Sequence, residues 1–201
     1  MLTAPLPPPA DEASRLMARI AAGDQAAFTT LVMRLHGPAL GLATRVLNNR
    51  HDAEDAVQAA LTRLWTIAAR YDPQRGSANA WFRRLLVNLC LDRRRSIKLV
   101  RSRVTTTLDD AWDIADSAPD PARIAETNAQ ARRIDAALAK LNPRQRAAIA
   151  LFHGEGATMA EVGEALDTTA KAVEGLLTRA RSELRALLAS DAPANRPESR
   201  T

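Results

Sequence analysis

The chain has 201 residues, a formal net charge of +5, and a composition that is 46% hydrophobic but only 3% aromatic. No apolar stretch approaches the roughly 20 residues that cross a bilayer, and the single cysteine, Cys90, excludes an internal disulfide and a cysteine zinc site. Because Ala, Leu and Arg dominate and strand-like alternation is absent, the sequence predicts an all-α protein. The apolar neighbours of Cys90 predict a buried thiol.

The first ten residues, MLTAPLPPPA, are rich in proline and lack the basic segment and apolar core of a secretory signal, so we expect a disordered leader. A helical N-terminal module is predicted over residues 11–98. Its apolar residues recur at helical spacing on both sides of an expected break at Gly23 and Asp24. A further apolar series over residues 40–47 ends at Asn48 and Asn49.

The segment DAEDAVQAALTRLWTIAAR, residues 52–70, predicts an amphipathic helix. Its first turn is acidic, which suits the positive end of the helix dipole. The apolar residues fall at i, i+3, i+4, i+7 and i+8 and so share one face. They are Val57, Ala60, Leu61, Leu64 and Trp65.

A loop, YDPQRGSANA (71–80), is predicted to precede an arginine-rich helix, WFRRLLVNLCLDRRR (81–95). Trp81 and the inward series of Phe82, Leu85, Leu86 and Leu89 are expected to pack in the core. A polar stripe is expected on another face of the same helix. It consists of Arg84, Asn88, Asp92 and Arg95.

Charge divides the chain between two kinds of partner. Residues 81–103 hold eight Arg or Lys and one acid, whereas residues 104–128 hold six acids and one base. The first stretch suits phosphate contact, while the second would be repelled by DNA. Residues 99–127 lose helical periodicity and are predicted to be a flexible acidic linker between two small helical domains.

The C-terminal module is predicted over residues 128–190, with a disordered tail over 191–201. Asn142 and Pro143 resemble an N-cap and first helical residue, and Thr158 with Glu161 matches a capping box. A three-residue turn at 167–169 then separates a short helix from a long, basic one. This arrangement is typical of a helix-turn-helix. A helical hairpin has similar turns, but the basic last helix favours DNA binding.

No catalytic or metal site is predicted. His36, His51 and His153 are isolated, and nothing near the acidic turn at 52–55 completes a metal site. A phosphate-binding glycine loop is also absent from the sequence. We therefore expect a protein that is not an enzyme, needs no cofactor or metal, has no small-molecule substrate, does not insert in a membrane, and is cytoplasmic.

Four motifs in order are similar to the extracytoplasmic-function sigma factors of bacteria. They are DAEDAVQ with LTRLW, then RGSANAWFRRLLVNLCLDRRR, then LNPRQRAAIALFHGEG, and a helix-turn-helix ending LTRARSELRALL. The likeness runs from about residue 24 to 188. It implies a two-domain initiation factor that binds core RNA polymerase and promoter DNA and is controlled by an anti-sigma factor.

The resemblance implies that the helix at 52–70 docks on the clamp of the largest polymerase subunit, and that the factor also touches the flap region. Its expected contact residues are Asp52, Glu54, Asp55, Gln58 and Leu61. The family often has Glu where this chain has Ala59, which weakens one part of that likeness.

The resemblance also implies that the loop and arginine-rich helix open the promoter hexamer near the start site. Arg75, Ser77 and Asn79 would line a pocket for a flipped base, while Arg84 and Asn88 would face DNA. Further phosphate contacts are expected from Arg83, Arg94 and Arg95.

The C-terminal module would read the distal hexamer, but it departs from the family here. Relatives commonly have a basic–Ser–Arg run where this chain has Glu174, Gly175 and Leu176. An acid accepts a hydrogen bond from cytosine N4 but repels phosphates, and Leu176 is expected to extend the core. The candidate DNA contacts are Thr169, Lys171, Glu174, Thr178, Arg179 and Arg181.

The main hypothesis is therefore a sigma factor that gives polymerase its promoter specificity. The alternative is a stand-alone helix-turn-helix regulator that binds duplex DNA without polymerase. A third hypothesis is a protein-interaction module that sequesters a partner. The N-terminal half discriminates, because a simple regulator has no use for DAEDAVQ joined to an arginine-rich helix.

Overall fold

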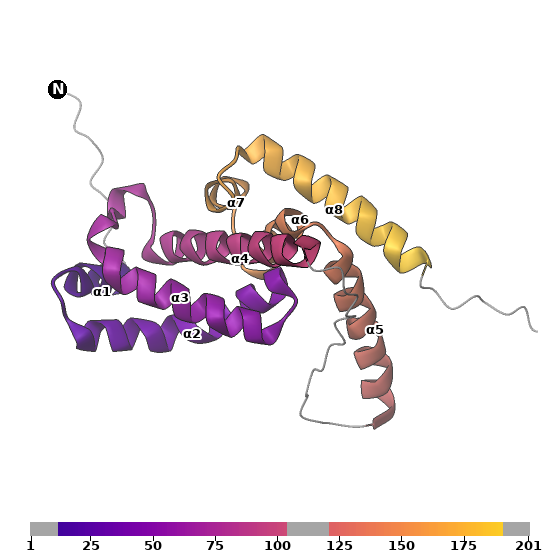
Figure 1. The fold of residues 1–201 in the computed structure, drawn as a ribbon, viewed down its shortest axis with the longest axis horizontal. Helices are drawn as coiled ribbons and strands as arrows, with labels where there is room; N and C mark the ends of the chain where they lie inside the picture. The colour runs from indigo at the N-terminus through magenta and orange to yellow at the C-terminus, as the bar shows by residue number, and fades with distance from the viewer. Residues whose placement is uncertain (1–11, 104–120, 191–201) are drawn as a thin grey trace, which may run out of the picture.

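The computed structural model describes residues 12–103 and 121–190. Every regular element in these two ranges is helical (Figure 1), so the prediction of an all-α fold is confirmed. The leader at 1–10, the central part of the expected linker at 104–120 and the tail at 191–201 lie outside the described residues. Within the described residues, no helix is both long and apolar enough to span a membrane.

The first two helices, α1 (Glu12–Ala21) and α2 (Gln25–Leu47), are separated at the predicted break. Gly23 adopts φ +88°, and the Asp24 carboxylate accepts hydrogen bonds from the backbone N–H groups of Ala26 and Ala27 at 2.9 and 3.0 Å. This is an N-cap. Helix α2 continues through Pro38, so the two apolar series predicted around it belong to one helix.

Asn48 and Asn49 form the turn into α3 (Arg50–Ile67). Asn48 has a left-handed φ of +55°, and the Asn49 side chain accepts a hydrogen bond from the backbone N–H of Asp52 at 2.9 Å. The inward face predicted for this helix is confirmed, because Val57 and Leu64 are buried. Two short 3₁₀ turns, Ala68–Arg70 and Pro73–Arg75, follow.

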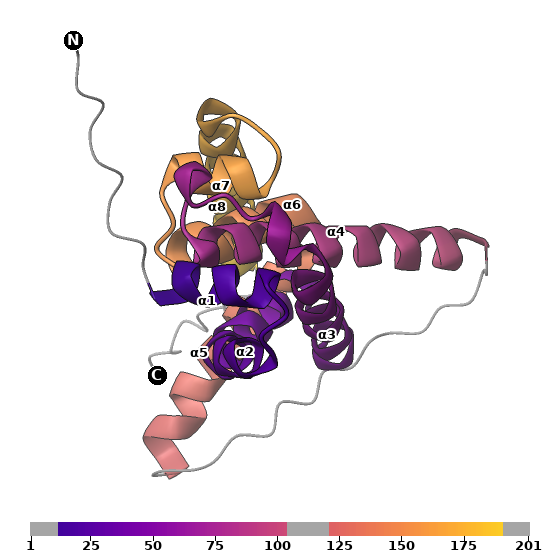
Figure 2. The ribbon, with the colours of Figure 1, turned by 90° about the vertical axis from the view of Figure 1, so that its left-hand side faces the viewer.

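Helix α4 (Ala78–Arg103) is longer than predicted at both ends. It begins three residues before Trp81, because the Ser77 hydroxyl accepts a hydrogen bond from the Ala80 N–H at 3.2 Å and caps the helix. At its other end α4 enters the expected linker and projects beyond the other helices (Figure 2). Helix α5 (Pro121–Lys140) also begins inside that linker, so residues 99–103 and 121–127 are helical.

The core positions of α4 are as predicted. Phe82 and Leu86 are buried, and Trp81, Leu85 and Leu89 are half-buried against the same core. Burial raises the pKa of the Cys90 thiol to about 12. The thiol is therefore protonated near neutral pH and is a packing residue, as expected.

The C-terminal helices are α6 (Pro143–Ile149), α7 (Met159–Ala165) and α8 (Ala170–Ser190), with a π-helical turn, Ala150–Gly154, after α6. Both predicted N-caps form, at Asn142 and at Thr158, and each is a complete capping box. Asp167 has a left-handed φ of +50° in the turn between α7 and α8. The helix-turn-helix is therefore present.

The N-terminal helices α1–α4 and the C-terminal helices α6–α8 pack against each other. Helix α7 packs against α4 (Figure 1). Helix α6 and the π-helical turn pack against α2. One continuous set of buried apolar side chains runs from Leu16 in α1 to Leu177 in α8. Helix α5 packs on α8.

Two glycines of the C-terminal module give opposite predictions for alanine substitution. A Cβ at Gly163 would lie 2.9 Å from the Thr168 carbonyl oxygen, whereas a Cβ at Gly175 would meet nothing within 4 Å. We expect Gly163→Ala to destabilise the module by about 1–3 kcal/mol through overpacking. Gly175→Ala should stabilise it by up to about 1 kcal/mol because alanine favours the helix. Denaturant unfolding of both variants checks this pair, and equal effects would contradict it.

Candidate functional site

The acids at the start of α3 form ion pairs within the N-terminal helices. The Arg93 guanidinium lies 2.7 Å from both the Asp52 and the Asp55 carboxylates, and Arg50 lies 2.9 Å from Glu54. Hydrogen bonding to Asp52 is the largest cause of the raised pKa of Arg93, and Asp55 adds to it. Asp52 and Asp55 thus tie α3 to α4, whereas Glu54 pairs within α3.

The prediction from sequence missed Arg93. The sequence suggests phosphate contacts for the neighbouring Arg94 and Arg95 but no role for Arg93. The only sequence signal was the opposite charge on two predicted helices. Their relative register, which places Arg93 across from Asp52 and Asp55, is set by packing between α3 and α4.

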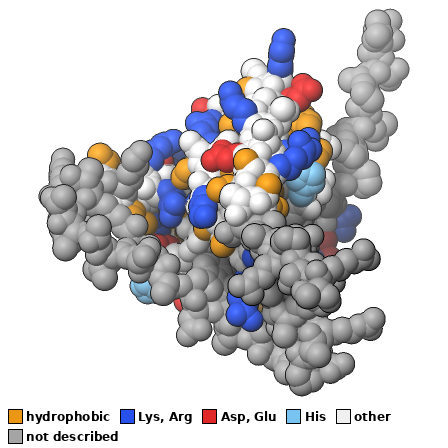
Figure 3. Space-filling model, turned by 90° about the vertical axis from the view of Figure 1, so that its right-hand side faces the viewer, with side chains coloured by type: hydrophobic (Ala, Val, Ile, Leu, Met, Phe, Trp, Pro, Cys, Tyr) orange, Lys and Arg blue, Asp and Glu red, His pale blue; other side chains and the backbone are white. Residues whose placement is uncertain are grey.

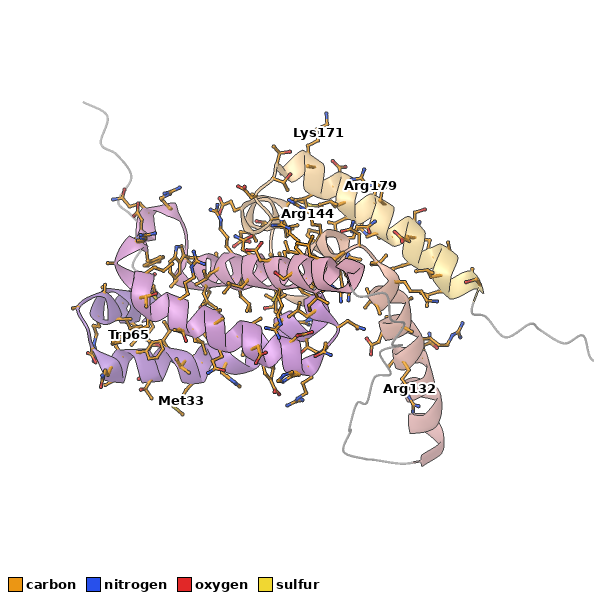
Figure 4. All side chains as sticks on the ribbon, in the orientation of Figure 1. Met33, Trp65, Arg132, Arg144, Lys171 and Arg179 are labelled. Carbon is orange, nitrogen blue, oxygen red and sulfur yellow. The ribbon has the colours of Figure 1, made fainter. Side chains whose placement is uncertain are left out.

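A shallow groove of about 440 Å³ lies between α2 and α3. Three of the predicted polymerase-contact residues, Glu54, Gln58 and Leu61, line it from α3. From α2 it is lined by Phe28, Val32 and His36, which the sequence did not suggest. Met33, the next residue to Val32, is 79% exposed (Figure 4). An apolar floor with a polar edge suits a protein partner.

A second cavity of about 250 Å³ lies where the loop before α4 meets α7. Four of the predicted DNA-contact residues line it: Arg75, Ser77, Arg83 and Arg84. The loop is held by Tyr71, whose hydroxyl donates a hydrogen bond to the Gly76 carbonyl oxygen at 3.0 Å. The Tyr71 ring also packs edge-on against the Trp81 ring, with 5.9 Å between the ring centroids. On its N-terminal side the cavity therefore combines arginines with an aromatic wall, while Glu161 and Glu164 of α7 line the other side.

Asn79, which the sequence resemblance places with Arg75 and Ser77 in a base pocket, does not line this cavity. It borders a different groove, formed with Phe82 and residues of α1 and α2. The reason is that α4 begins at Ala78 rather than at Trp81. Because side chains turn by about 100° per helical residue, Asn79 points to a different side from Ser77.

The predicted polar stripe on α4 is only partly open to a ligand. The Arg84 side chain is 47% exposed, and Asn88 is half-buried beside it. Arg95 pairs with Asp92 at 2.8 Å. Arg94 donates to the Leu47 carbonyl oxygen at 3.3 Å, so it caps the end of α2 and is less available than predicted.

Helix α8 presents a mixed-charge face. Lys171, Glu174, Thr178 and Arg179 are exposed, and Lys171 points away from the rest of the molecule (Figure 4). Lys and Arg side chains are grouped on this side with a few acids among them (Figure 3). The Thr169 hydroxyl accepts from the Ala172 N–H at 3.2 Å and caps the helix.

Two further predictions for α8 can be compared with the structure. Leu176 packs against the core, as expected. Arg181 is half-buried and its guanidinium lies 3.3 Å from His153 Nε2, so it is not simply an outward DNA contact. In the part of the chain that the structure describes, no three His, Cys, Asp or Glu side chains lie close enough together to hold a metal ion.

Comparison with protein families gives two matches that follow the two groups of helices. Residues 31–116 match the family model Sigma-70 region 2, and residues 131–184 match Sigma-70 region 4. The first contains the acidic turn, all of the groove except Phe28, and the arginine-rich helix. The second contains the helix-turn-helix.

Individual relatives agree with the family models. The chain is 33% identical over 186 residues to the ECF RNA polymerase sigma factor SigE of Mycolicibacterium smegmatis, covering 90% of this chain and 70% of that protein. It is also 33% identical to the RNA polymerase sigma factor CnrH of Cupriavidus metallidurans, covering 91% of this chain and 97% of that protein.

Two solved structures share the fold. CnrH in complex with the cytosolic domain of CnrY matches 89% of this chain and 97% of its own, with a TM-score of 0.62 and 31% identity. The sigma factor RpoE of Bartonella quintana, in complex with the anti-sigma factor NepR, matches 82% of this chain and 98% of its own, with a TM-score of 0.66. At 19% identity, the second supports the fold alone.

Proposed function

The chain belongs to the extracytoplasmic-function subfamily of sigma-70 sigma factors, and from that premise we propose that it binds core RNA polymerase and directs initiation at specific promoters. Residues 11–98 act as region 2, which binds polymerase and opens DNA. Residues 128–190 act as region 4, which reads the distal promoter element. The factor works in the cytoplasm and has no catalysis of its own.

One observation carries this proposal. The cavity beside α4 brings together Arg75, Ser77, Arg83 and Arg84, four residues proposed to contact DNA from the sequence. Arginines neutralise phosphates, and a cavity beside an aromatic wall accepts an unstacked base. A stand-alone regulator of duplex DNA has no use for such a cavity, which disfavours that alternative.

The groove between α2 and α3 is the proposed polymerase-binding surface. Its outer edge holds Glu54 and Gln58, and its floor holds Val32 and Leu61. Asp52 and Asp55 add to the negative edge while remaining paired with Arg93. We propose that a basic, amphipathic surface of the polymerase clamp docks here, because charge complementarity steers association and apolar contact holds it.

An anti-sigma factor is the proposed regulator. The relative CnrH is described in complex with the cytosolic domain of CnrY, and RpoE in complex with the anti-sigma factor NepR. CnrH is aligned with this chain over 97% of its length at 31% identity. We propose that an anti-sigma factor also binds this chain.

The polymerase-binding surface is tested by Met33→Asp. Met33 is 79% exposed and follows Val32 of the groove, so the change should leave the fold intact. Loss of its apolar side chain should weaken core binding, because apolar contact with the partner is lost. We expect the affinity for core polymerase to fall about tenfold, which corresponds to about 1.4 kcal/mol of binding free energy. Fluorescence anisotropy titrations with core polymerase measure this change.

Thr30→Asp is the matched control for this test. Thr30 is exposed on the same helix, two residues before Val32 and therefore on roughly the opposite side from it. The Thr30→Asp variant carries the same added charge as Met33→Asp and should bind core polymerase as tightly as the unmodified chain does. Equal binding by the two variants would place the polymerase contact elsewhere.

A further inference from the structure

The loop before α4 is exposed along its whole length. Residues 72–77, which include the cavity-lining Arg75 and Ser77, are all exposed. Between these two residues, Gly76 adopts φ +134° and ψ 172°, a backbone conformation that is essentially confined to glycine. Because the loop residues bury little surface themselves, the shape of the loop depends on polar contacts that reach it from other elements.

A chain of two hydrogen bonds connects this loop to α1. The Tyr71 hydroxyl donates to the Gly76 carbonyl oxygen at 3.0 Å, and the same hydroxyl lies 2.6 Å from the Ser14 hydroxyl of α1. A phenol has one hydrogen to donate, and a carbonyl oxygen can only accept. Ser14 is therefore the donor to Tyr71. We call these two side chains, Ser14 and Tyr71, the tether.

Both ends of the tether are attached to packed helices. Ser14 is 8% exposed, and α1 packs against the 3₁₀ turn Ala68–Arg70 that directly precedes Tyr71. The Tyr71 ring packs edge-on against Trp81 of α4. Hydrogen bonds that are chained and partly shielded from water reinforce one another, so the tether can hold the Gly76 peptide group in a fixed place.

The tether joins two parts of the chain that differ in their relation to the family. Helix α1 ends before residue 31, where the match to Sigma-70 region 2 begins, whereas Tyr71 and Gly76 lie within that match. The sequence did not suggest the contact, because 57 residues separate Ser14 from Tyr71. A side chain outside the matched residues is thus coupled to a loop inside them.

We propose that Ser14 and Tyr71 are positioning residues for promoter opening. The tether fixes the Gly76 carbonyl group, and through the adjoining peptide groups it keeps Arg75 and Ser77 on the wall of the cavity. A cavity that is already ordered accepts an unstacked base without the entropic cost of ordering its loop. This inference rests on the proposed function, because it takes the cavity to bind a promoter base.

Two substitutions remove the tether with little change in shape. Tyr71→Phe removes only the hydroxyl and keeps the ring that contacts Trp81. Ser14→Ala removes the donor on α1 and introduces a residue that favours the helix. Because both substitutions break one hydrogen-bond chain, the double variant should behave like Tyr71→Phe alone, whereas independent effects would add.

Ala18→Gly is the matched control. Ala18 is exposed on the same helix as Ser14, and glycine weakens the interior of a helix. This variant therefore lowers the stability of α1 while both hydroxyls of the tether remain. An effect that all the variants share reports a general loss of helix stability, and an effect confined to the tether variants reports the position of the loop.

The test is a cycle between protein and DNA, measured with holoenzyme that contains the full chain. Fork-junction DNAs made from a promoter that this holoenzyme opens carry an abasic site at each position, one at a time, of the unpaired strand of the hexamer near the start site. The ratio of the dissociation constants for abasic and intact DNA measures how strongly the base at that position is bound. A residue that only supports the fold changes both constants equally and leaves their ratio unchanged.

For the unmodified chain we expect one position at which the abasic site weakens binding about tenfold, as the loss of a stacked base does. At that position Tyr71→Phe, Ser14→Ala and the double variant should each lower the ratio about threefold, the effect of one neutral hydrogen bond. Ala18→Gly should keep the ratio of the unmodified chain.

Two kinds of result would contradict the inference, and they differ in what else they exclude. An unmodified holoenzyme that is insensitive to every abasic site contradicts base binding by the cavity, and the tether then has no base to position. A sensitive position at which the tether variants keep the full ratio, or at which Ala18→Gly lowers it equally, overturns the role of the tether alone. In that second case the proposed function stands.

Discussion

Replacing Arg84 and Asn88 together with alanine should reduce promoter opening on the order of 100-fold while leaving core-polymerase binding unchanged. Arg84 is on the exposed side of α4, Asn88 is half-buried one turn further on, and both are far from the groove between α2 and α3. A hydrogen bond that involves a charged group is worth about 1.5–3 kcal/mol and a neutral one about 1 kcal/mol. Losing one hydrogen bond of each kind raises the barrier to promoter opening enough to slow it on the order of 100-fold.

Permanganate reactivity of unpaired thymines, measured with saturating holoenzyme, reports the opening step directly. Arg84→Ala also removes the ion pair with Asp167, which by itself would favour separation of the modules. If the double variant loses core binding instead, this face of α4 has been assigned to the wrong partner.

Replacing Glu174 with alanine should relax the choice of base at one position of the distal promoter element. Glu174 is exposed on the second turn of α8, between Lys171 and Thr178 on the same face. Residues near the start of a recognition helix reach base edges, and a carboxylate accepts a hydrogen bond from cytosine N4. We expect a preference for cytosine worth about 1–3 kcal/mol, or roughly 5- to 150-fold, to disappear.

Holoenzyme transcribes a library of promoters that is randomised in the distal element. Sequencing the transcripts measures the base preference at every position of that element in one experiment. Lys171→Ala serves as the comparison, because loss of a phosphate-binding charge should weaken all sequences about equally. An unchanged cytosine preference in Glu174→Ala would exclude direct reading by this carboxylate. An equal loss of transcription from all promoters in Glu174→Ala would indicate that the Glu174 side chain stabilises α8 instead.

Local signals in the sequence predicted the helices and their caps well. Asn142 and Thr158 each form the cap that their spacing indicated, because capping depends on residues within one turn. The apolar face of α3 was predicted for the same reason. The start of α4 was misplaced because Ser77, three residues upstream of Ala80, was not recognised as its N-cap.

The sites were predicted less completely because they depend on contacts between distant helices. The pairing of Arg93 with Asp52 and Asp55 joins positions about 40 residues apart, and nothing in the local pattern fixes that register. The same is true of Phe28, Val32 and His36, which complete the groove from α2. The sequence also did not suggest the ion pairs that join Arg45 to Glu155, Arg83 to Glu161 and Arg84 to Asp167 across the linker.

The central claim is that this chain gives polymerase the ability to start transcription at specific promoters. Multi-round transcription in vitro, with core polymerase from a related bacterium and fragments of the source genome, tests it most directly. We predict defined transcripts from a small subset of fragments, dependent on the added factor and abolished by Arg84→Ala with Asn88→Ala. Binding of the factor to the same fragments without polymerase, and no factor-dependent transcript from any of them, would contradict the account and favour a stand-alone regulator.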